Sequence, residues 1–232
     1  ADRPVQCMFS GLPGSGKSTE LLRLAALLND TSGPNFLTVI ANAEELVDLS
    51  NEIDVPDVLI ALLYETERQV LVAENRNPAE ALRDGPMRRL WDWFTRTDVT
   101  LMGGEFGLGG DDASAKLAFE LKTRQTVRQK VRAVVSAHLR QFIAEVQSEF
   151  KELQARVKDT GREGLVLILD SLEKLQGMST NFQSVLASAE AIFANGAPYL
   201  QLPVHVIYTI QPALLARMRF DGTVWFMPMV KV

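Results

Sequence analysis

Nine residues near the start of the chain have the types and spacing needed to bind phosphate. Gly11 to Ser18 fit the pattern G-x-x-x-x-G-K-[ST] of a P-loop, or Walker A motif. Its glycines let the backbone curl so that N–H groups point at phosphate oxygens, Lys17 reaches the β- and γ-phosphates, and the Ser18 hydroxyl coordinates Mg²⁺. A turn without a ligand would need the glycines but not the Lys-Ser pair, so a nucleotide site is predicted. We expect it to comprise Gly11, Leu12, Pro13, Gly14, Ser15, Gly16, Lys17, Ser18 and Thr19.

Two carboxylates lie at and just after the end of the most apolar run of the chain, Gly164–Asp170. Asp170 stands at the end of that run, where a carboxylate can hold Mg²⁺ as the Walker B acid. Glu173 can orient and deprotonate an attacking water, and its alternative interpretation is an exposed helix acid paired with a nearby cation. Ser171 occupies the position where many ATPases have a second acid, so slow hydrolysis is expected.

Polar residues at the other end of the chain are further candidates. Thr209 and Gln211 close an apolar run and can contact the γ-phosphate or the water, or equally cap the next helix. Arg217 and Arg219 follow, and either can act as an arginine finger, although a solvated surface position is favoured for each.

A stripe of arginines recurs at helical spacing in the middle of the chain. Arg124, Arg128 and Arg132 lie at i, i+4 and i+8, on one face of a helix. The stripe could clamp phosphate, meet an acidic partner or touch nucleic acid, but a solvated helix face is the favoured interpretation. Trp91, Trp93 and Phe94 are interpreted as local core.

The hydrophobic pattern indicates elements that position these residues. Five short apolar runs are separated by helical patterns, which predicts an α/β fold with a doubly wound, parallel, five-stranded sheet and the ligand at the carboxyl ends of its strands. The expected strands are 5–9, 36–41, 164–170, 204–209 and 223–227. Residues 52–160 are expected to be a mostly helical insert within one domain spanning 1–232. Residues 111–160 contain no Gly or Pro, so we expect one very long helix or two joined end to end, with a bend or a protruding arm.

Composition narrows the functional classes. The chain has 232 residues, 47% of them hydrophobic, and a net charge of −5, which disfavours nucleic-acid binding as the main function. The single cysteine, Cys7, excludes an intramolecular disulfide and is interpreted as a buried, inert thiol of a cytoplasmic protein. No apolar run is long enough to span a membrane. His138 and His205 lack metal-ligand spacing and are interpreted as structural. Because little precedes the loop and an apolar run, 224–229, ends the chain, we expect an excised domain whose flanking sensor or effector domains are missing.

Three runs together resemble the AAA/STAND-type P-loop ATPases of bacteria, the class with an additional strand between the Walker A and Walker B strands. They are Gly14–Leu21, Leu167–Leu175 and Tyr208–Pro212. The resemblance implies a sheet ordered 5-1-4-3-2, ATP and Mg²⁺ as cofactors, and a nucleotide-dependent switch that forms homo-oligomers when nucleotide is bound, with a role in signalling or bacterial defence. No Asn-Lys-x-Asp motif appears, so ATP is preferred over GTP.

Two other functions fit the same motifs. One is a P-loop kinase that phosphorylates a small molecule, with the arginine stripe on a lid. The other is a scaffold that binds ATP and assembles without hydrolysing it. The continuous helical pattern of the insert favours the hydrolysing switch over the kinase, whose lid is usually short.

Overall fold

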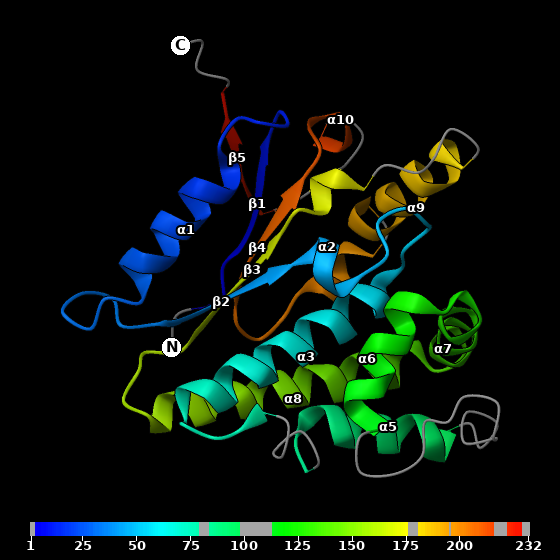
Figure 1. Cartoon of the computed structure of the whole chain (residues 1–232), viewed down its shortest axis with the longest axis horizontal. Coiled ribbons are helices and arrows are strands. Elements are labelled where there is room, and N and C mark those ends of the chain that lie inside the picture. Colours follow the sequence, from blue (N-terminus) through cyan, green and yellow to red (C-terminus); the bar gives the residue numbers. More distant parts are fainter. Residues whose placement is uncertain are drawn as a thin grey trace.

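The centre of the molecule is a parallel sheet of five strands (Figure 1). The computed structural model describes residues 3–78, 84–97, 113–175, 181–194, 196–215 and 222–228. The strands lie in the order β2-β3-β4-β1-β5 and every neighbouring pair is parallel, so the predicted order is confirmed. They are β1 (Gln6–Gly11), β2 (Leu37–Asn42), β3 (Leu165–Asp170), β4 (His205–Ile210) and β5 (Thr223–Met227).

Alternation along the strands explains how both faces of the sheet are covered. Ile168 of β3 packs with Leu21 and Ala25 of helix α1, whereas its neighbours Leu167 and Leu169 belong to the main core. Successive side chains of a strand point to opposite faces, so α1 covers one face and the main core covers the other. Both faces of β3 are therefore buried, which is why it is a continuous apolar run, whereas β5 at the edge of the sheet is mostly exposed.

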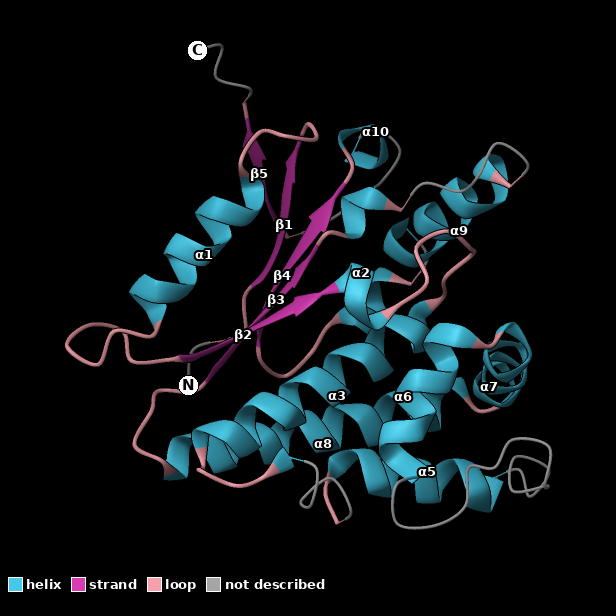
Figure 2. Cartoon of the chain, in the orientation of Figure 1, coloured by secondary structure: helices cyan, strands magenta, loops and turns pink. Residues whose placement is uncertain are grey.

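The helices that follow β2 and precede β3 in the sequence form a layer, which covers the face of the sheet opposite α1 (Figure 2). Helix α3 packs on β2, β3 and α8, and α5, α6 and α7 pack on this pair. The described helices are α1 (Lys17–Leu28), α2 (Ala43–Leu46), α3 (Val55–Ala73), α5 (Pro86–Thr97), α6 (Ala113–Thr123), α7 (Gln125–Ala137), α8 (Leu139–Asp159), α9 (Phe182–Ala194) and α10 (Pro212–Leu215), with 3₁₀ turns η2 (Leu172–Lys174) and η3 (Ala197–Leu200).

The segment without Gly or Pro is three helices rather than one or two, and it folds back onto the domain. Its chain direction changes at Arg124 and His138, which leave the helical conformation with φ of −119° and −130°. The first break is stabilised by Arg128, whose Nη1 donates to the carbonyl oxygens of Leu121 and Lys122 at 3.1 and 3.0 Å. These carbonyls end α6 and would otherwise lack partners, so a side chain takes the place of a Gly or Pro signal.

Aromatic residues close the core of the helical layer. Trp91, Trp93 and Phe94 are buried, which confirms them as local core, and Trp93 and Phe94 stack against Phe142 of α8. Within the described part of the chain, no helix is long and apolar enough to cross a membrane.

Candidate functional site

The phosphate-loop sequence forms the turn between β1 and α1. β1 ends at Gly11 and α1 begins at Lys17. Gly14 and Gly16 have φ of 77° and 89°, in the left-handed region where a side chain is disfavoured, and Gly16 is the N-cap of α1. The N–H of Ser15 donates to the carbonyl of Leu12 at 3.1 Å and tightens the loop. The motif therefore places the positive end of α1 at the carboxyl edge of the sheet.

Lys17 is the buried centre of this site, although it is a charged residue. It is 4% exposed, and its Nζ donates to the carbonyl oxygens of Gly11 and Leu12 at 3.0 and 3.1 Å. Nζ also lies 3.2 Å from Oε1 of Glu173. A buried ammonium needs acceptors for its three protons, and these three oxygens supply them.

The turn after β3 brings the two predicted carboxylates to the same edge. Asp170 is the last residue of β3, and its Oδ1 accepts from the N–H of Ser171 at 2.8 Å. Ser171 has φ of 68°, a conformation that non-glycine residues rarely adopt, and it turns the chain into η2. Glu173 is thereby 6% exposed and pairs with Lys17, so its interpretation as an exposed acid is wrong.

Thr209 and Gln211 support this turn from β4. The Thr209 hydroxyl donates to the carbonyl of Leu169 at 3.2 Å and accepts from the N–H of Leu172 at 3.1 Å. Gln211 Nε2 donates to the carbonyl of Leu175 at 2.7 Å. Both residues therefore position the segment that contains Glu173, and contact with a phosphate stays a prediction.

Two buried polar atoms of the site receive no hydrogen bond from the described residues. They are Ser15 Oγ in the loop and Glu173 Oε2 beside Lys17. Buried polar groups are nearly always paired, so these two atoms mark a place where a polar ligand can bind. Ser18 and Thr19 are exposed at the start of α1.

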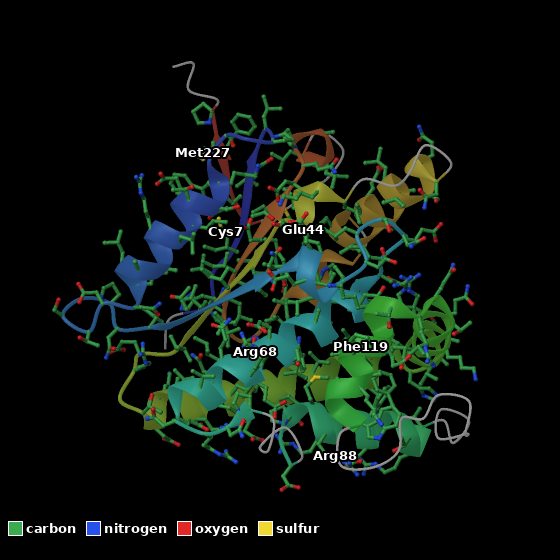
Figure 3. The ribbon with its side chains drawn as sticks, viewed as in Figure 1. Cys7, Glu44, Arg68, Arg88, Phe119 and Met227 are labelled. Carbon is green, nitrogen blue, oxygen red and sulfur yellow. The ribbon has the colours of Figure 1, made fainter. Side chains whose placement is uncertain are left out.

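The sequence did not indicate that Met227 belongs to this site. β5 pairs with β1 so that Met227 lies opposite Gly11, and its Cε is 3.5 Å from where a Cβ on Gly16 would lie (Figure 3). A Cβ on Gly11 would lie 2.9 Å from the Met227 carbonyl oxygen, so only glycine fits there. Such strand pairing is long-range information that no local pattern carries.

The arginine stripe lies elsewhere and is only in part a solvated face. Arg128 is 5% exposed and binds Asp48 at 3.2 Å, and Arg132 forms an ion pair with the buried Asp57. Arg124 alone has an exposed side chain, with Glu120 as its partner. The favoured interpretation is therefore wrong for Arg128 and Arg132, whose side chains join α7 to other parts of the helical layer, and it holds for Arg124. Arg217 and Arg219 lie outside the described residues.

The single cysteine and the two histidines lie outside the candidate site. Burial raises the pKa of Cys7 to about 11, which suits an inert thiol. His205 Nδ1 accepts from the N–H of Val5 at 3.1 Å, and its ring packs on Phe36. His138 is the exposed junction of α7 and α8.

The donor set of the site suits Mg²⁺. The Ser18 hydroxyl and the Asp170 carboxylate are hard oxygen ligands, which this ion prefers over nitrogen or sulfur. Glu173 adds a buried carboxylate oxygen without a partner among the described residues.

No model of a known protein family matches this chain, and no curated protein matches it.

Proposed function

We propose that this chain is a P-loop domain that binds and hydrolyses Mg-ATP and acts as a nucleotide-dependent switch coupled to oligomerisation. The observation that carries the proposal is the 3.2 Å contact between Lys17 and Glu173. It joins the phosphate loop to the segment after β3, two regions that the sequence motifs assign to one ATPase site.

The contacts of Lys17 suggest how nucleotide binding and catalysis are linked. The Lys17 ammonium is shared by two loop carbonyls and by Glu173. Phosphate oxygens compete for the same ammonium, so binding of the nucleotide frees the carboxylate of Glu173. The freed carboxylate can accept a proton from the attacking water, which is the task of a general base.

The chain's other residues orient the nucleotide. The N–H groups of the loop and the start of α1 hold the phosphates, while Thr209 and Gln211 fix the turn that presents Glu173. Ser18 and Asp170 would hold Mg²⁺, which when bound neutralises charge on the phosphates.

The arginine contacts weaken the kinase alternative. That function needed Arg124, Arg128 and Arg132 on a lid, but Arg128 and Arg132 form ion pairs inside the helical layer. The non-hydrolysing scaffold differs from our proposal only in what Glu173 does, so a measurement at Glu173 separates them.

We expect Glu173→Gln to lower steady-state phosphate release from Mg-ATP by about 10²- to 10⁴-fold, the usual contribution of a general base. ATP affinity should be unchanged or higher, because the competitor for Lys17 loses its charge. The matched control is Glu44→Gln, an exposed acid that pairs with Lys174 next to Glu173. It should hydrolyse at the parent rate.

Three other outcomes decide against the proposal. Binding without release in the parent chain would favour the scaffold. Release that requires an added acceptor metabolite would favour the kinase. Equal release by the parent and Glu173→Gln would remove Glu173 from catalysis.

A further inference from the structure

A cavity lies in the helical layer, away from the phosphate loop. Its volume is about 450 Å³, and it is bounded by α2 and the segment after it, by α3, by α6 and by the start of α7. Pockets of this size hold small molecules. No residue of the phosphate loop lines it, and neither Asp170 nor Glu173 does.

The wall of the cavity is mainly apolar. Ile53, Ile60, Ala61 and Leu121 are buried and form one part of it. Figure 3 labels Phe119 on α6. This residue also lines the cavity and yet is 64% exposed, so it lies where the cavity opens. An apolar ligand would cover surface that is otherwise in water.

The cations of the wall already have acceptors. Arg128 binds two backbone carbonyls and Asp48, and Lys122 Nζ donates to the carbonyl of Glu45 at 2.6 Å. An anionic ligand would therefore meet the carboxylates of Glu45, Asp48 and Asp57 without an available cation. Carboxylates and phosphates are disfavoured as ligands.

One acceptor of a residue in the wall lacks a hydrogen-bond partner among the described residues. Asp57 is 4% exposed, and its Oδ2 accepts from Arg132 and from the N–H of Asp54. Its Oδ1 is also buried but receives no hydrogen bond from the described residues. Among the described residues that line the cavity, it is the one buried side-chain polar atom in this condition. Such an atom calls for a donor.

We propose that this cavity binds a small molecule with an apolar body and one head group that donates a hydrogen bond to Asp57, an amine or an alcohol. The proposal stands independently of the nucleotide site, because it uses none of that site's residues. A second hollow shares Val47, Asp48, Lys122 and Thr123 with the cavity and reaches Lys174, the neighbour of Glu173. The cavity thus adjoins a hollow that reaches the segment containing the candidate base.

Three probes with one apolar body test the head group. They are 2-phenylethylamine, 2-phenylethanol and phenylacetate, titrated into the full chain while methyl NMR shifts of Ile53, Ile60 and Ala61 are followed. We expect the amine and the alcohol to bind at least tenfold more tightly than phenylacetate. Equal binding of all three, preferred binding of phenylacetate, or no binding of any probe would overturn the proposal.

Variants test the place of binding. Ala118→Trp adds a large side chain at a partly exposed position of the wall and should weaken binding of the amine at least tenfold. Phe119→Ala should weaken it by a smaller factor. The matched control is Leu27→Ala, which removes an equally exposed apolar side chain from α1 and should bind as the parent does. Parent-like binding by Ala118→Trp would overturn the proposal.

The Asp57→Asn variant tests the acceptor. It keeps the shape of the side chain and should reduce the preference for the amine over phenylacetate at least fivefold. An unchanged preference in folded protein would overturn the assigned contact. If this variant fails to fold, the probe series and Ala118→Trp still decide the proposal.

Discussion

Buried charges occur in two regions of this molecule, and the two regions use them differently. At the carboxyl edge of the sheet, Lys17 contacts loop carbonyls and Glu173, and buried oxygens of Ser15 and Glu173 lack partners among the described residues. The backbone there adopts left-handed conformations at three positions, Gly14, Gly16 and Ser171. Strained backbone and unpaired polar atoms cluster at functional sites.

The helical layer uses its charges mainly to join helices, although Oδ1 of Asp57 and Oε1 of Glu67 also lack hydrogen-bond partners among the described residues. Arg156 binds Glu74 through two hydrogen bonds of 2.8 and 2.6 Å, and Arg89 bonds to both Glu149 and Glu152. These pairs join helices that are far apart in the sequence. Burial of a charge therefore does not by itself indicate a functional site. The two regions differ in whether the partners of a buried charge can be replaced by atoms of a ligand.

Two arginines of the same stripe should differ in how much they stabilise the folded chain. Arg128→Met should lower the free energy of unfolding by about 3 kcal/mol, because it removes the donor of two helix-end carbonyls and the cationic partner of Asp48. Arg124→Met is the matched control from the same stripe, and its exposed pair should contribute less than about 1 kcal/mol. Urea unfolding measures both. ATP affinity should stay at the parent value, and equal stability of the two variants would contradict this account of the layer.

A buried acid of the helical layer should make stability depend on pH. Burial raises the pKa of Glu67 from 4.5 to about 7, although Arg156 and Arg89 oppose this and the N–H of Met87 donates to Oε2 at 2.8 Å. The folded state thus keeps a proton that the unfolded state loses, so stability should fall as pH rises from about 4.5 to about 7.

The Glu67→Gln variant isolates this effect. The pH-dependent loss attributable to Glu67 is on the order of 3 kcal/mol, and the variant should lack it. Urea unfolding between pH 4.5 and 8 measures the change. The same pH slope in the variant and the parent would contradict the assignment.

The smallest expected effect tests strain at the carboxyl edge of the sheet. Ser171 has φ of 68°, which costs a non-glycine residue about 1 kcal/mol and costs glycine little. Ser171→Gly should therefore raise the free energy of unfolding by about 0.5 kcal/mol, since greater freedom of the unfolded chain offsets part of the gain. Thermal unfolding measures it, and a clear loss of stability would show that the serine side chain stabilises the turn.

The sequence predicts the inner strands well because strands such as β3 are buried on both faces of the sheet, whereas β5 at the edge is mostly exposed. The runs around Ile168 and Tyr208 are continuous in apolar residues, and this needs no knowledge of the rest of the chain. The phosphate loop is equally local, because its glycines and Lys17 form one turn. Both features are determined by residues that are close together in the sequence, so a local sequence pattern is enough to predict them.

Long-range contacts could not be predicted in the same way. The break at Arg124 depends on Arg128, whose side chain binds the end of α6, and no local sequence rule for ending a helix includes such a contact. The position of Met227 depends on the pairing of β5 with β1. The partner of Glu173 is Lys17, whereas the alternative interpretation of Glu173 paired it with Lys174 or a later cation. Each of these contacts is chosen by packing in three dimensions.

The most direct test of the central claim is the affinity of the chain for Mg-ATP with and without Lys17. Isothermal titration of the parent, Lys17→Ala and Lys174→Ala should show a loss of about 10- to 100-fold for Lys17→Ala, the size expected when a charge-assisted hydrogen bond is removed. Lys174→Ala, which removes an exposed lysine paired with Glu44, should bind as the parent does. Equal affinity of the parent and Lys17→Ala would contradict the assignment of a nucleotide site at the phosphate loop.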